Sequence, residues 1–210
     1  MADESKRIED DEWLPSAIYL IDNSSNLVDA WATRFSATPE VKPINGDYFQ
    51  QRADAIVSPA NSFGIMDGGL DLAIRDQLGF AVESNLQSVI REKHHGELPV
   101  GCAEIIETGH EKWAYLISAP TMRVPESIEF TINAYLAFRA ILVAVENLNK
   151  TAGRRIIDSL VCSGLGTGVG RMAPTRCAGQ MYMAYKSMLF SPIIGRFRSI
   201  HEFHRDLRNA

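Results

Sequence analysis

The feature that most constrains the fold is a pattern that occurs twice: an apolar strand, then a glycine-rich loop, then a helix. The first copy has a short apolar run at residues 55–57, the loop SPANSFGIMDGG and a helix expected over residues 70–78. The second has an expected strand at residues 156–162, the loop SGLGTGVGRM and a helix from Pro174 to about residue 189. Short apolar runs bounded by turn residues are typical of parallel strands buried on both faces. The pattern therefore predicts a layered α/β fold with right-handed crossovers.

Other apolar patterns supply the remaining elements of one domain, which we expect over residues 13–190. Residues 1–12 form a charged leader that is predicted to be disordered. Residues 191–210 form a C-terminal tail with Arg and His in a short amphipathic pattern. We expect further strands at residues 17–21, 41–44, 102–107 and 113–118, and further helices at residues 27–35, 81–91 and 127–149, the last with Ser127 as its N-cap.

Composition narrows the class of protein. The chain has 210 residues, 46% of them hydrophobic, which suits one globular domain with a substantial core. A net charge of −5 without a basic stripe argues against sequence-independent nucleic-acid binding. Cys102, Cys162 and Cys177 are odd in number and have no CxxC spacing, so we expect neither a disulfide framework nor a zinc site. We also expect no other metal and no cofactor. No apolar run is long enough to cross a membrane, and we therefore expect a cytoplasmic protein.

The first glycine loop has the features of a ligand site. Pro59 ends strand pairing because it lacks an N–H group, so the chain leaves the sheet where open α/β sheets bind ligands. Gly68 and Gly69 permit close approach or positive φ, and the helix that follows presents free N–H groups that attract anions. The alternative is a tight turn in which Asp71 is only a first-turn acid favoured by the helix dipole.

The second glycine loop has glycine at every second position from Gly164 to Gly170. Such a loop can converge its N–H groups on a pyrophosphate. It does not match the dinucleotide-binding fingerprint, because the sixth position from Gly164 is Val169, and the chain contains no Walker A motif. The alternative is a mobile surface loop, although four glycines carry an entropic cost that a connector does not need.

Together, Gly46-Asp47, DAIVSPAN, the step from Gly68 to Asp71 and SGLGTGVG resemble the macrodomain family over roughly residues 41–189. The resemblance implies a three-layer α/β/α sandwich with a mostly parallel central sheet. It also implies that the partner is ADP-ribose or an ADP-ribosylated macromolecule. Some members of the family hydrolyse ADP-ribose derivatives or remove ADP-ribose from proteins or nucleic acids.

The same resemblance implies roles for individual residues. Asp47 would take the adenine amino group, with Tyr48 beside it. Asn61 would hydrogen-bond the distal ribose, which Gly68 and Gly69 would approach closely, and Asp71 matches the acid of hydrolytic members. The loop that would wrap the diphosphate comprises Ser163, Gly164, Leu165, Gly166, Thr167, Gly168 and Val169.

Two ligand-binding positions depart from the family pattern. Ser58 stands where the family commonly has Asn, and Asp67 where it has a further Gly. Asp67 is then either a second catalytic acid or an obstruction. From the residues alone, Asp47 is also explained as a turn residue and Asn61 as an Asx-turn residue.

Three functions are consistent with these residues. The first is a hydrolase that acts on a mono-ADP-ribosyl group or on ADP-ribose 1″-phosphate, with Asn61, Asp67 and Asp71 as the catalytic residues. The second is a non-catalytic reader that binds ADP-ribose. The third is a structural or assembly module without a ligand.

Overall fold

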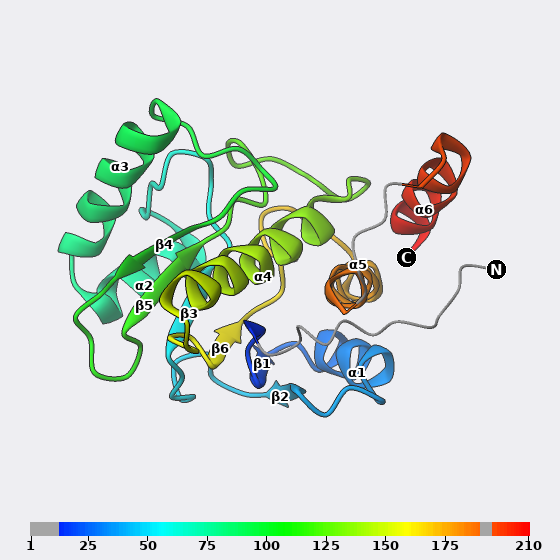
Figure 1. The fold of residues 1–210 in the computed structure, drawn as a ribbon, viewed down its shortest axis with the longest axis horizontal. Coiled ribbons are helices and arrows are strands. Elements are labelled where there is room, and N and C mark those ends of the chain that lie inside the picture. The colour runs from blue at the N-terminus through cyan, green and yellow to red at the C-terminus, as the bar shows by residue number, and fades with distance from the viewer. Residues whose placement is uncertain (1–12, 190–194) are drawn as a thin grey trace.

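The computed structural model describes residues 13–189 and 195–210, so the predicted leader lies outside the described residues. A six-stranded sheet with the order β2-β1-β6-β3-β5-β4 forms its centre (Figure 1). The first five strands in this order are parallel, and β4 pairs antiparallel with β5. The strands are β1 (Ala17–Asp22), β2 (Val41–Asn45), β3 (Ala55–Ser58), β4 (Glu104–Glu107), β5 (Tyr115–Ser118) and β6 (Ser159–Cys162).

Helices cover both faces of this sheet. Three of them, α1, α4 and α5, share one core with the sheet, and α2 and α3 share a second core on the other face. This arrangement confirms the predicted α/β sandwich. The helices are α1 (Ser25–Arg34), α2 (Gly69–Leu78), α3 (Ala81–His94), α4 (Asn133–Ala152), α5 (Pro174–Met188) and α6 (Phe197–Asn209).

Strand β3 shows why a short continuous apolar run predicts a strand buried on both faces of the sheet. Ala55 and Val57 belong to the core beneath α4 and α5, whereas Ile56 between them belongs to the core beneath α2 and α3. All three side chains are fully buried. Because successive side chains of a strand point to opposite faces, a strand covered on both sides needs a continuous apolar run.

Helix α4 begins later than predicted. The apolar spacing indicated a start at Ser127, but the helix starts at Asn133, and Ser127 does not cap it. Ile128 is buried, and its N–H group donates to the Gly170 carbonyl at 2.9 Å. Gln180 donates to the Thr131 carbonyl at 2.8 Å. These bonds hold residues 127–132 against the second glycine loop and α5, so tertiary contacts override the local helical preference.

The C-terminal tail contains a helix, α6, that packs on the domain. Leu207 is buried, and its carbonyl accepts a hydrogen bond from Gln180 at 3.0 Å. Ala210 lies so close to Gly179 that a Cβ there would come within 2.9 Å of the Ala210 Cβ. The C-terminal end of α6 therefore rests on α5, as the red helix in Figure 1 shows.

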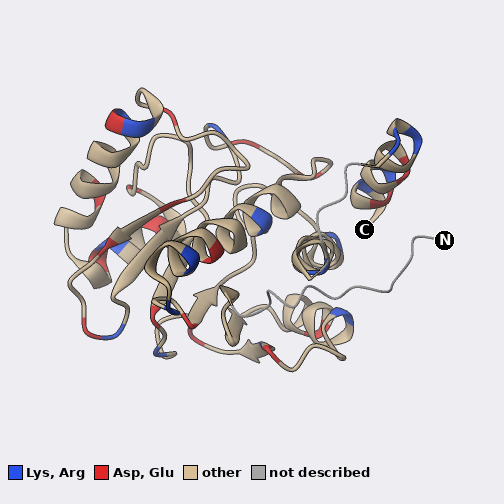
Figure 2. Ribbon diagram, in the orientation of Figure 1, with Lys and Arg blue, Asp and Glu red and all other residues tan. Residues whose placement is uncertain are grey.

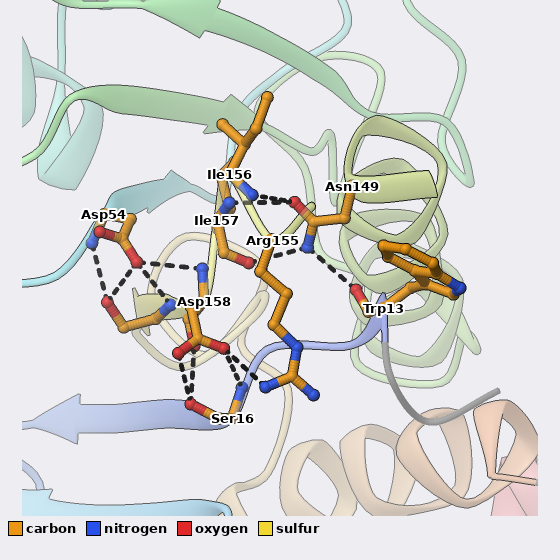
Figure 3. A network of polar contacts seen from close by, with 9 residues as sticks. Trp13, Ser16, Asp54, Asn149, Arg155, Ile156, Ile157 and Asp158 are labelled. Atoms are coloured by element: carbon orange, nitrogen blue, oxygen red, sulfur yellow. Dashed lines mark hydrogen bonds and ion pairs between the residues drawn. The ribbon is translucent and has the colours of Figure 1, made fainter. Parts of the chain in front are cut away.

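A polar network joins the amino ends of three strands (Figure 3). The Asp54 carboxylate, just before β3, accepts hydrogen bonds from the Asp158 and Ser159 N–H groups at 3.0 and 2.8 Å and from the Ser159 hydroxyl at 2.8 Å. Asp158 in turn accepts from the Ser16 hydroxyl at 2.8 Å, before β1. These side chains set the positions of β1, β3 and β6 relative to one another at this edge of the sheet.

Asn149 extends the same network and explains why β6 is shorter than predicted. Its side-chain oxygen accepts from the Ile156 and Ile157 N–H groups at 2.7 and 3.0 Å. Its amide nitrogen donates to the Trp13 and Ile157 carbonyls at 2.9 and 3.0 Å. The backbone at Ile156 and Ile157 therefore bonds to a helix side chain, and β6 starts only at Ser159.

The two edge strands carry residues that suit an edge. Strand β2 contains Lys42 and Pro43, and proline is tolerated in a sheet mainly at an edge. Strand β4 begins with Glu104, whose carboxylate lies 2.8 Å from both the Lys93 Nζ and the His94 Nε2 of α3. It ends with Glu107, which is exposed.

Candidate functional site

A cavity of about 510 Å³ opens along the carboxyl ends of the parallel strands. Its lining runs from Gly46, after β2, to Thr121, after β5. Gly46 and Thr121 follow the first and the last of five neighbouring strands, whose carboxyl ends span roughly 19 Å at a spacing of about 4.8 Å. The cavity is therefore suited to an elongated ligand.

An acid lies at the β3–β5 end of the cavity. Asp71 sits in the first turn of α2, and the fully buried Ser58 at the end of β3 donates its hydroxyl to Asp71 Oδ1 at 2.5 Å. Burial raises the pKa of Asp71 to about 6, while the hydrogen bond from Ser58 lowers it and the nearby negative charge of Asp67 adds to the rise. A carboxyl group with such a pKa can accept a proton near neutral pH.

Ser58 occupies a different place from the one predicted. It was expected to contact the ligand, but its side chain is fully buried and does not line the cavity. It lies behind Asp71 instead, where its small side chain leaves room for the short hydrogen bond to the carboxylate. The exposed Asp67, by contrast, lines the cavity mouth.

Asn61 forms an Asx turn, as the alternative interpretation predicted. Its side-chain oxygen accepts from the N–H groups of Phe63 at 3.0 Å and Ile65 at 3.3 Å, and its amide nitrogen donates to the Ile65 carbonyl at 2.7 Å. The residue also lines the cavity. The amide thus holds the loop that carries Asp67, and its contact with a ribose stays a prediction.

The two adjacent glycines of the first loop face open space. Gly69 has φ +57°, and Gly68 is the extended N-cap of α2. A Cβ at either position would meet nothing within 4 Å, and both residues line the cavity. The positive φ at Gly69 is one of the two uses expected for this pair, and close approach of a ligand to the backbone stays a prediction.

The glycines of the second loop divide into two groups. Gly166 has φ +78°, and a Cβ there would collide with Ile128 Cδ1. A Cβ at Gly170 would come within 2.5 Å of the Gly166 carbonyl oxygen, and one at Gly164 would collide with Thr167. These three glycines therefore allow the loop to fold tightly. Gly164, Gly166 and Gly168 all line the cavity, but only at Gly168 would a Cβ meet nothing within 4 Å.

This division predicts opposite results for two alanine variants. Gly166→Ala should lower the free energy of unfolding by about 2 kcal/mol, because the residue adopts positive φ and its Cβ would clash. Gly168→Ala should leave stability unchanged and weaken binding only if a ligand approaches the backbone there. Denaturant unfolding and ligand titration of both variants separate the two roles, and equal destabilisation by both would contradict the division.

Most of the predicted diphosphate loop lines the cavity. Leu165 differs, because it is fully buried in the core and does not line the cavity. The members that line the cavity are Ser163, Gly164, Gly166, Thr167, Gly168 and Val169.

The opposite end of the cavity lies near β1 and β2. Tyr48 follows β2 and lines the cavity, but it is buried and its hydroxyl reaches the middle of the sheet, where it lies 2.6 Å from the Val57 carbonyl of β3 and 3.0 Å from the Val161 carbonyl of β6. Burial raises the pKa of this hydroxyl well above its usual value, so it remains a donor.

Asp47 is exposed and does not line the cavity. Its carboxylate accepts from the Phe49 N–H group at 2.9 Å, a turn contact that lowers the pKa of Asp47. Its contact with adenine stays a prediction.

Sequence reasoning missed several lining residues that directly follow strands. Asp22 and Asn23 come at the end of β1, and Thr121 and Met122 follow β5. No glycine pair or motif marks them. The only signal was their position after predicted strands, since the carboxyl ends of parallel strands meet at one edge of the sheet.

Two further expectations concerned metal sites and membrane-spanning helices. Among the described residues, no three His, Cys, Asp or Glu side chains are grouped closely enough to hold a metal ion. None of the helices in the described ranges has the length and apolar character needed to cross a bilayer.

Cys162 and Cys177 are buried, and burial raises the pKa of both thiols, that of Cys177 to about 12. Both thiols therefore stay protonated and pack in the core.

Comparison with known proteins identifies the family. The family model of the Macro domain matches residues 57–181, and the chain therefore belongs to the macrodomain family. An uncharacterized protein of Aeropyrum pernix is 34% identical over 139 residues, which cover 66% of this chain and 67% of that protein. A macro domain-containing protein of Caldanaerobacter subterraneus is 44% identical over 80 residues, covering 38% of this chain and 45% of that protein.

Solved structures agree with the fold. The macrodomain of Mycobacterium tuberculosis DarG matches with a TM-score of 0.56 and 18% identity, covering 69% of this chain and 88% of that one. A variant of the Oceanobacillus iheyensis macrodomain, solved with ADPR, matches with a TM-score of 0.56 and 18% identity, covering 78% and 89%. At this identity the similarity concerns the fold.

Proposed function

We propose that this protein binds ADP-ribose in the cavity and hydrolyses an ADP-ribose derivative. The substrate is a mono-ADP-ribosyl group on a macromolecule or ADP-ribose 1″-phosphate. The observation that carries the proposal is the buried Asp71 carboxyl, which Ser58 holds at the cavity end and whose pKa is about 6.

The order of groups along the cavity supports ADP-ribose as the ligand. Asp22 and Asn23 at the β1 end suit a purine, and the second glycine loop in the middle suits a diphosphate. Asp67 and Asp71 at the β3–β5 end suit a ribose. No Lys or Arg occurs among the described residues that line the cavity, and Figure 2 shows the Lys and Arg positions scattered along the ribbon. Backbone N–H groups would therefore hold the diphosphate. Structures of the Oceanobacillus iheyensis macrodomain contain ADPR in one case and ADP in another.

The proposed reaction is attack of water on C1″ of the distal ribose. Ionised Asp71 accepts one proton from the water molecule as its oxygen bonds to C1″. The bond from C1″ to the leaving group breaks, and its electron pair departs with the leaving group, which is then protonated. Orientation of the ribose and diphosphate by the two loops supplies the attack geometry.

The pH dependence of hydrolysis tests this proposal. Because Asp71 must be ionised, release of ADP-ribose from a mono-ADP-ribosylated protein should rise with pH through about 6 and level off above it. The measurement is free ADP-ribose released between pH 5 and 8. A rate that falls over this range would contradict a base role for Asp71.

A non-catalytic reader is the second candidate function, and the loop geometry favours it. The Asn61 amide makes its hydrogen bonds inside the loop, and the charged Asp67 stands at the cavity mouth. Calorimetry with ADP-ribose separates the candidates. Binding without turnover supports the reader, and no binding overturns both functions.

A further inference from the structure

Two residues that line the cavity carry buried hydroxyl groups that have no hydrogen-bond partner among the described residues. These hydroxyls belong to Thr121, which is 1% exposed, and Ser163, which is 6% exposed. An unpaired buried hydroxyl costs free energy in the folded protein. When it faces a cavity, a ligand can supply the missing partner.

The backbone contacts of Thr121 leave only this hydroxyl free. Its N–H group donates to the Ala60 carbonyl at 3.0 Å, and its carbonyl accepts from the Asn133 amide at 2.7 Å. The next residue, Met122, forms a β-bridge with Asn61. Thr121 is therefore held rigidly beside the first loop, at the end of the cavity that contains Asp71.

Ser163 lies elsewhere along the cavity. It directly follows β6, which lies between β1 and β3 in the sheet, and it begins the second glycine loop. Thr121 follows β5, two strands away from β6. The two residues thus line different parts of the cavity.

We propose that Thr121 determines specificity for the distal ribose, because its hydroxyl hydrogen-bonds that sugar while the Ser163 hydroxyl hydrogen-bonds the diphosphate. This inference rests on the proposed binding of ADP-ribose. It adds a residue that distinguishes ADP-ribose from ADP, a ligand that ends at the second phosphate and has no distal ribose.

Ser118 provides a matched control. Its hydroxyl is also buried and unpaired among the described residues, and it lies three positions before Thr121 at the end of β5. It does not line the cavity. If the unpaired hydroxyl of Thr121 has no role in binding, its removal should affect ligand affinity no more than removal of the Ser118 hydroxyl does.

Calorimetry of ADP and ADP-ribose with the full chain tests the proposal. Thr121→Val should weaken ADP-ribose binding about 3- to 10-fold and leave ADP binding unchanged, because one hydrogen bond to the ribose is lost. Ser163→Ala should weaken both ligands by a similar factor, and Ser118→Ala should weaken neither. Thr121→Ser, which keeps the hydroxyl, should retain the wild-type preference for ADP-ribose over ADP.

Thermal unfolding without ligand supplies a second readout. Thr121→Val should unfold at the same temperature as the wild type or higher, since a methyl group replaces an unpaired hydroxyl of similar size. Equal loss of ADP and ADP-ribose affinity, or no loss, would overturn the role of Thr121. Failure of the wild type to bind either ligand would instead overturn the proposed function itself.

Discussion

Asp71→Asn is expected to lower the rate of ADP-ribose release by roughly a thousandfold, within the range typical of a lost general base. The amide has nearly the same shape as the carboxylate and can still accept the hydrogen bond from Ser58, but it cannot take a proton from water. ADP-ribose affinity should therefore change only a few-fold. Release kinetics and calorimetry on the same preparation measure both quantities.

Two neighbouring acids serve as controls for this variant. Asp76 is exposed on the same helix and does not line the cavity, so Asp76→Asn should leave the rate unchanged. Asp67→Asn removes a negative charge that raises the pKa of Asp71, so its rate should reach its plateau at a lower pH. If Asp71→Asn releases ADP-ribose as fast as the wild type, the proposed mechanism is wrong.

The same variant has a predictable effect on stability. The pKa of Asp71 is about 6 in the folded protein, whereas the ordinary pKa of an aspartate is 3.8, so the folded state binds the proton more tightly than the unfolded state. The wild type should therefore lose stability as pH rises from about 4 to 6, by up to about 3 kcal/mol. Asp71→Asn should be more stable than the wild type at pH 7, and this difference should vanish below about pH 4.

The second large effect is expected far from the cavity. Asn149→Ala should lower the free energy of unfolding by about 4 kcal/mol, because the fully buried side chain satisfies four backbone contacts with Trp13, Ile156 and Ile157 (Figure 3). Its removal leaves buried N–H and carbonyl groups without partners, each at a cost of about 1–3 kcal/mol. Denaturant unfolding monitored by circular dichroism measures the loss.

Asn147 is the matched control for this experiment. It lies on the same helix two residues earlier and is exposed, so Asn147→Ala should change stability by less than about 0.5 kcal/mol. ADP-ribose affinity should stay the same in both variants under conditions where they are folded. Similar stabilities for the two variants would contradict the structural role given to Asn149.

The elements that could be predicted were those with a strong local signal. Strand β3 has an apolar run that stops at Pro59, and α5 has a proline in its first turn, and both lie where the sequence placed them. Helix α4 and strand β6 were predicted too long, because distant partners such as the Gly170 carbonyl and the Asn149 side chain take backbone groups that regular structure would use. Such bonds have no local signature.

The site shows the same limit. Glycine pairs and alternating glycines located both loops, since a backbone that takes positive φ, as at Gly69 and Gly166, or packs closely on its neighbours, as at Gly170, requires this residue. Thr121 was missed because an unpaired hydroxyl is visible only when all of its neighbours are known. Ser58 was assigned to the ligand because it stands where the family commonly has Asn, and the sequence could not show that its hydroxyl would bond to Asp71 away from the cavity lining.

The residues of the two edge strands affect whether another chain can pair with this sheet. A second chain that tried to extend the sheet would meet Pro43, which offers no N–H group, along β2 and the acidic ends of β4 along the other edge. Growth of the sheet into stacked or fibrillar assemblies is therefore disfavoured at both ends. The cavity opens instead at the carboxyl ends of the strands, where a molecule can enter without pairing with the sheet.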